Sequence, residues 1–128
     1  MPKKSNLSEI KDKKLPVILG TQTKYPQTKY LFYDLNAFAE LEEIYGTVND
    51  SLKALRGGAV KDFINFLWAG LLHEDETLTP KDVGRLSDLS TAKEIMKTIH
   101  TAVYQAITPS EAEKQTAKKE KNSSPKNV

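Results

Sequence analysis

The fold of this 128-residue chain is decided by the stretch FINFLWAGLLHED, residues 63–75. On a helix that advances about 100° per residue, most of the apolar side chains here fall within one sector about 100° wide. This predicted core sector contains Val60, Phe63, Ile64, Leu67 and Leu71. Trp68 lies at its edge, whereas Phe66 and Leu72 point more than about 100° away from its centre. Such a helix must be the central helix of its domain or lend one face to a partner.

Two interpretations of Phe66 and Leu72 remain open. In the first, other helices or strands of the same chain cover them. In the second, they form part of a docking surface, because an exposed apolar patch usually marks a contact site. Both interpretations hold at once if the protein oligomerises. The candidate partner-binding residues are therefore Phe66, Trp68, Ala69 and Leu72.

Helical patterns lie on both sides of this segment, which we expect to be helical from about residue 59 to 73. Upstream, a helix is predicted from about residue 36, with Asn36 as its N-cap and Gly46 as its stop. A shorter helix follows and ends at residues 56–58, the sequence Arg-Gly-Gly. The apolar stripe of the first of these helices consists of Leu35, Phe38, Leu41, Ile44 and Tyr45.

Downstream, Thr79 and Pro80 mark a clear helix start, because threonine caps a helix and proline favours its first position. The core side of this helix would carry Val83, Leu86 and Leu89. The last helix is predicted to begin at Thr91, with Glu94 completing a capping box. Its apolar stripe consists of Ile95, Met96, Ile99, Val103, Tyr104 and Ile107.

Two β-prone runs precede the helices, at residues 15–20 and 29–34, with a turn-rich connection between them. Two strands alone are marginally stable, so we expect them to lie against helices. The predicted fold is mainly α: a small domain of four to five helices with a short N-terminal antiparallel strand pair, over residues 15–107. The segments 1–14 and 108–128 are Lys-rich and poor in large apolar groups, so we expect both to be disordered.

Composition narrows the function classes. The net charge of +2 is uneven, because both end segments are basic and residues 15–107 hold nine basic against twelve acidic side chains. An acidic body argues against a nucleic-acid-binding core, although the basic ends could touch RNA or DNA weakly. The chain has no cysteine, no apolar run of membrane-spanning length and no secretory signal at its N-terminus. A cytoplasmic location and no membrane partner are expected.

No catalytic, cofactor or metal site can be assembled from the sequence with any specificity. His73 precedes three acids, but consecutive residues at a helix end point apart and cannot converge on a metal, so an exposed loop is the preferred interpretation. His100 is expected to be a half-buried packing residue, and Glu40, Glu42 and Glu43 a solvated helix face. Neither a phosphate-binding loop nor a Ser–His–Asp arrangement is present. We expect a protein that is not an enzyme.

Two further function classes stay open. Residues 80–107 form two predicted helices joined by a short turn, the outline of a helix-turn-helix DNA reader. Against this, the second helix offers Lys93, Lys97 and His100 but no arginine to read guanine, and the turn lacks the usual glycine. The other class is a small helical adaptor whose partner the sequence does not name.

Three blocks of the sequence resemble a known family. Residues 33–43, YDLNAFAELEE, are similar to the "DLNALAELEE" opening of tail assembly chaperones from long-tailed (siphovirus-type) phages and prophages of Gram-positive bacteria. Residues 67–75, LWAGLLHED, resemble a family "LLWAGLLHED", and residues 78–86, LTPKDVGRL, an "LTLEEVGELL" type. The order and spacing of the blocks agree, whereas residues 20–29 and the basic N-terminal extension depart from the pattern.

The resemblance implies a non-enzymatic role without cofactors. Such chaperones bind the tape-measure protein, a very long and largely helical chain, keep it soluble and help to recruit tail-tube subunits around it. They act in the cytoplasm of the bacterial host and are absent from the mature virion. Self-association is also implied. An apolar surface containing Phe66 or Leu72 would suit an amphipathic partner helix.

Family members are often made in two lengths by a programmed ribosomal frameshift near the end of the short product. The resemblance therefore implies that the tail-tube protein is engaged through a longer form. Lys118 and Lys119 are a candidate junction, because an A-rich slippery run could encode them. A coding sequence without a slippery heptamer near these codons would remove this hypothesis.

Overall fold

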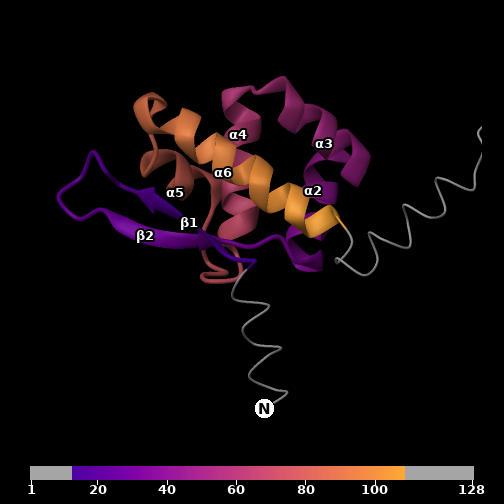
Figure 1. Cartoon of the computed structure of the whole chain (residues 1–128), viewed down its shortest axis with the longest axis horizontal. Coiled ribbons are helices and arrows are strands. Elements are labelled where there is room, and N and C mark those ends of the chain that lie inside the picture. The colour runs from indigo at the N-terminus through magenta and orange to yellow at the C-terminus, as the bar shows by residue number, and fades with distance from the viewer. Residues whose placement is uncertain (1–12, 109–128) are drawn as a thin grey trace, which may run out of the picture.

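A computed structural model of the chain describes residues 13–108 (Figure 1). The predicted disorder of residues 1–14 and 108–128 therefore falls almost entirely outside the described residues. The described part is mainly helical with an N-terminal antiparallel strand pair, which confirms the predicted fold class. Its elements are β1 (Leu15–Leu19), β2 (Gln27–Leu31), α2 (Leu35–Tyr45), α3 (Val48–Gly57), α4 (Val60–Leu71), α5 (Pro80–Arg85) and α6 (Leu89–Ile107).

The two strands pair from Leu15 opposite Leu31 to Leu19 opposite Gln27. The second strand thus lies two to three residues earlier than the predicted run at 29–34. The reason is that the chain leaves the sheet after Leu31: the Phe32 backbone N–H donates to the carbonyl of Gly70 in α4, at 2.9 Å. The sheet is anchored to the helices at its other end as well, where the Gly20 N–H donates to the Leu86 carbonyl at 2.8 Å.

Helix α4 is the central element, as its apolar sequence predicted. It contacts α2, α3, α5, α6 and β2. Figure 1 shows the long helix α6 running diagonally across the molecule, with the strand pair on one side and α2 and α3 on the other. Leu67 and Leu71 on α4 and Ile99 on α6 are almost completely buried. Their burial supplies much of the hydrophobic stabilisation of the domain.

Several predicted helix ends are correct. Gly46 ends α2 with a backbone φ of 98°, and Gly58 follows α3 with a φ of 74°. Residues with a Cβ rarely adopt such positive φ values. Two predicted caps are wrong. The side chain of Asp34 rather than Asn36 caps α2, and Asp88 caps α6, which begins at Leu89 and not at Thr91. An aspartate lies two positions before Asn36 and three before Thr91, and in each case its carboxylate accepts from a free N–H group of the first turn.

Some residues predicted to lie in apolar core stripes are exposed instead. Leu35 and Ile44 flank the side of α2 that is buried, which carries Ala37, Phe38 and Leu41. Val60 and Leu89 are the first residues of α4 and α6 and lie beyond the part of each helix that a neighbour covers. The same holds near the other end of α6, where Tyr104 and Ile107 are exposed. His100, expected to be a half-buried packing residue, is exposed as well. No helix of the described part is long and apolar enough to cross a membrane.

Candidate partner-binding groove

The predicted docking residues Phe66 and Ala69 are core residues. Both are fully buried, so neither can contact a partner in this structure. The rings of Tyr33 and Tyr45 both pack against Phe66, with centroids 6.3 and 6.1 Å from that of Phe66. The docking-surface interpretation is therefore wrong for these two positions. A helical wheel with one covered face does not describe α4, because α2, α3, α5, α6 and β2 all contact it.

Trp68 and Leu72, the other two candidates, are half-buried. The Trp68 indole N–H donates to the backbone carbonyl of Leu78 at 2.8 Å, so this side chain holds the loop between α4 and α5. Leu72 is the C-cap residue of α4. The four candidate residues do not form one exposed surface. In the described structure they pack in the core, bond to a loop or end a helix.

An apolar groove opens elsewhere on α4, between α4, α5 and α6. Its volume is about 350 Å³. We call it the α4–α6 groove; its apolar lining consists of Val60, Phe63, Ile64, Leu89, Ala92 and Met96. Val60 is 58% exposed and Leu89 is 78% exposed, which is unusual for apolar residues of this size so close together. A shallower hollow continues from the groove across Lys61, Pro80 and Lys81 and shares Val60, Ile64 and Gly84 with it.

The local sequence explains why this space stays open. Helix α5 has only six residues and ends before it can cover α4 further. Gly84 faces Ile64 without a side chain; a Cβ built on it would lie 3.5 Å from Ile64 Cδ1. Gly57 and Gly58, which precede α4, have nothing near the position of a Cβ. Two glycines, Gly58 and Gly84, therefore line the groove together with the exposed Val60.

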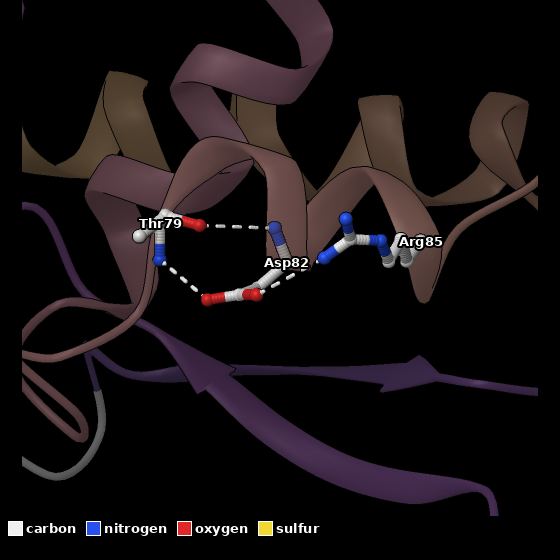
Figure 2. Close-up of polar contacts among 3 residues, drawn as sticks. All are labelled: Thr79, Asp82 and Arg85. Carbon is white, nitrogen blue, oxygen red and sulfur yellow. Dashed lines mark hydrogen bonds and ion pairs between the residues drawn. The ribbon is translucent and has the colours of Figure 1, made fainter.

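The start of α5, one wall of the shallower hollow, is held by a reciprocal cap (Figure 2). Thr79 Oγ1 accepts from the Asp82 N–H at 3.1 Å, and Asp82 Oδ2 accepts from the Thr79 N–H at 3.0 Å. This confirms the predicted helix start. The other oxygen of Asp82 lies 3.6 Å from the Arg85 guanidinium, an exposed ion pair that adds little to stability.

The groove has a basic rim. Lys93 lines the groove itself, and Lys61, Lys81 and Arg85 line the adjoining hollow. Within residues 13–108, the two ion pairs are Arg85–Asp82 and Lys97–Glu94, so the three lysines of the rim have no carboxylate partner there.

Asp88 is the single acid among the lining residues of the described part. Its carboxylate accepts from the Ser90 hydroxyl at 2.7 Å and the Thr91 N–H at 3.1 Å. These two bonds, that of Ser90 first, lower the pKa of Asp88 below its usual value. Asp88 is therefore a helix cap that stays ionised at neutral pH, and its single negative charge lies beside the three lysines and one arginine of the rim.

The residues considered for metal chemistry do not converge. His73 Nε2 lies 2.7 Å from the Tyr30 carbonyl oxygen, and the His73 ring packs edge-on against Phe32 with centroids 5.6 Å apart. It is half-buried, not free in an exposed loop as expected. In the range 13–108, no three histidines or acids are grouped so that they could hold a metal ion.

Sequence reasoning missed the groove because it placed Val60 and Leu89 in the core. The available signal was their position: each is an apolar residue at the first turn of a helix, beside glycine or a polar turn. Comparison of the chain with protein-family models, with curated proteins and with solved structures finds no match.

Proposed function

We propose that this protein is a tail assembly chaperone of a long-tailed phage or prophage. It binds the tape-measure protein in the cytoplasm of the bacterial host, keeps it soluble and helps to recruit tail-tube subunits through a longer, frameshifted form. It is not an enzyme and does not remain in the mature virion. The three sequence blocks at residues 33–43, 67–75 and 78–86 support this proposal through their resemblance to that family.

The structural observation that carries the proposal is the exposed apolar lining of the α4–α6 groove. An amphipathic helix docks in such a groove through apolar side chains at positions i, i+3, i+4 and i+7. Val60 and Leu89 lie on two different helices and line the same groove, so one partner helix could contact both. A long helical client with many apolar faces is the class of partner that this surface suits.

The three blocks and the groove have different parts in this proposal. Residues of the blocks contact one another: Tyr33 of the first block packs against Gly70 of the second, and the Trp68 indole of the second bonds to Leu78 of the third. They hold the domain together. Val60 and Leu89 lie outside all three blocks. We infer that the family-like motifs maintain the scaffold, and that client recognition rests on residues which the motifs do not include.

The test is co-expression with the tape-measure protein of the same gene cluster, followed by pull-down and a solubility assay. Val60→Asp and Leu89→Asp should abolish retention of the client, because each places a charge in the apolar groove. Leu35→Asp is the matched control: Leu35 is 84% exposed on α2, away from the groove. All three residues are the first of their helices, where aspartate is favourable, so each variant should fold.

If only wild type and Leu35→Asp retain the tape-measure protein, the result supports both the proposed function and the groove as the binding site. If all four proteins retain it, the proposed function stands but the groove is not the binding site. If wild type neither binds nor solubilises the client, the proposed function is wrong.

The alternative, a helix-turn-helix DNA reader, predicts salt-dependent binding of duplex DNA. The structure offers it little support at the place where a recognition helix contacts bases. The first residues of α6 are an exposed leucine and Ser90, preceded by the carboxylate of Asp88. Lys97, further along α6, is paired with Glu94 at 3.6 Å. Fluorescence anisotropy with a mixed duplex at low and high salt tests this alternative directly.

A further inference from the structure

We propose that the α4–α6 groove selects an amphipathic helix whose apolar face is flanked by carboxylates. This inference deepens the proposed function, since it names the chemistry of the client segment, and it rests on that function only for the identity of the client. The observation behind it is the juxtaposition of an exposed apolar floor with a rim of lysines.

The floor determines that the occupant is apolar on one side. Ile64 and Met96, both half-buried, lie deeper in the groove than the exposed Val60 and Leu89. A helix side chain inserted between α4 and α6 would remove these four residues from water together. Burial of apolar surface drives such association.

The rim determines the charge at the edges of that occupant. Lys61 and Lys81 lie on the α4 and α5 side, and Lys93 lies on the α6 side. None of the three has a carboxylate partner within residues 13–108, and the single acidic lining residue there, Asp88, caps α6. Residues 15–107 as a whole carry more acidic than basic groups, so the basic rim is a local departure from the charge of the domain. Complementary charges across an interface favour the matching partner and oppose the other.

A second copy of the chain fits this groove poorly. The acidic helix of the described part is α2, with Glu40, Glu42 and Glu43 exposed. Its two exposed large apolar residues, Leu35 and Ile44, are about 180° apart around the helix axis, so α2 has no exposed apolar stripe to insert into the groove. The apolar side of α2 is already buried against its own domain. The occupant that the basic rim favours is therefore an acidic amphipathic helix of another protein.

Two synthetic peptides of equal length test the proposal. Both carry leucine at the same i, i+3, i+4 and i+7 positions; one has glutamate at the flanking positions and the other lysine. Binding is followed by calorimetry and by amide chemical-shift changes on the labelled protein. The glutamate peptide should bind at least about tenfold tighter than the lysine peptide at low salt, and the difference should shrink at high salt. Shifts should centre on Val60, Ile64 and Leu89.

Charge reversal supplies the matched comparison. Lys61→Glu/Lys93→Glu should reverse the preference between the two peptides. Lys24→Glu/Lys53→Glu changes the net charge by the same amount on exposed lysines that line neither hollow, and should leave the preference intact. Equal reversal by both double variants would mean that overall charge, not the rim, sets the preference, and would overturn the proposal.

Three results of the peptide experiment would each overturn the proposal. They are equal affinities for the two peptides, tighter binding of the lysine peptide, and chemical-shift changes away from the groove. A wild-type dimer that Leu89→Asp dissociates and that neither peptide displaces would also overturn it, because a second copy would then occupy the groove. If the peptides behave as expected but the tape-measure protein is not retained, the groove chemistry stands and the proposed function fails.

Discussion

Gly70 on α4 lies directly against Tyr33, with no room between them for a methyl group. A Cβ built on Gly70 would lie 2.7 Å from Tyr33 Cζ and 2.8 Å from Leu31 Cδ2. The close approach lets the Tyr33 hydroxyl donate to the Phe66 carbonyl at 2.5 Å. Glycine inside a helix costs roughly 1 kcal/mol relative to alanine, and here that cost permits the segment after β2 to pack on the central helix.

We therefore expect Gly70→Ala to destabilise the protein although alanine is the better helix former. The added methyl group must displace a buried tyrosine and a buried leucine, which typically costs about 1–3 kcal/mol. Gly57→Ala is the control, because Gly57 is helical and has nothing within 4 Å of the Cβ position. It should be neutral or stabilising by up to about 1 kcal/mol. Urea unfolding measures both; a Gly70→Ala variant as stable as wild type would contradict this packing.

Local signals explain what could be predicted from the sequence. The helix end at Gly46 and the helix start at Thr79 each depend only on residues within about four positions of that site. Both could therefore be predicted directly from the local sequence. The central place of α4 followed from its apolar composition. The strand pair followed from two β-prone runs. The residue at which the second strand ends depends on a contact with α4, and such a contact cannot be predicted from the local sequence.

Burial around a helix could not be predicted in the same way. A helical wheel gives the direction of each side chain, but not which directions are covered. Phe66 lay outside the predicted core sector and is fully buried, because Tyr33 and Tyr45 reach round α4 to enclose it. Val60 lay inside the sector and is exposed, because no element extends over the first turn of α4. The candidate site therefore moved from Phe66 to the groove at Val60, because the sequence does not show which faces of α4 are covered.

Phe66 provides a stability prediction that follows from this correction. Phe66→Ala should lower the free energy of unfolding by about 3–5 kcal/mol, the usual cost of emptying a buried aromatic site. Phe66→Asp should leave the chain unfolded, since a carboxylate would be buried without a partner. Circular dichroism during a thermal scan measures both. A folded Phe66→Asp protein that failed to bind its client would instead restore Phe66 as a contact residue.

The cap of α5 predicts a graded effect on stability. Thr79→Ala removes the acceptor for the Asp82 N–H and should cost about 1 kcal/mol. Arg85→Ala removes only the exposed ion pair with Asp82 and should cost no more than about 0.5 kcal/mol. Emission from Trp68, the single tryptophan, follows unfolding next to the loop that Thr79 ends. Equal losses in the two variants would mean that the ion pair, and not the cap, holds α5.

Tyr45 predicts how stability depends on alkaline pH. Its hydroxyl donates to Asp62 Oδ1 at 2.5 Å and accepts from the Asn65 side-chain N–H at 3.2 Å. Burial first, and then the bond to Asp62, raise the pKa of Tyr45 to about 12 from its ordinary value of 10.0. The folded state therefore keeps this proton at pH values where the unfolded chain has lost it.

The sign of the effect follows from proton linkage. Because the unfolded state binds fewer protons between pH 10 and 12, the free energy of unfolding falls as pH rises through that window. The contribution of Tyr45 is complete below pH 10 and is lost as the pH passes its folded pKa. Tyr45→Phe cannot ionise, so the stability difference between wild type and this variant should narrow steadily above pH 10.

Urea midpoints of both proteins from pH 8 to 11.5 give this comparison. Burial raises the pKa of Tyr33 as well, so some alkaline loss of stability should remain in Tyr45→Phe. Parallel curves for the two proteins would contradict the assignment, because they would mean that Tyr45 ionises equally readily in the folded and unfolded states. A gap that closes above pH 10 would instead show that the folded state raises the pKa of Tyr45, through its burial and its bond to Asp62.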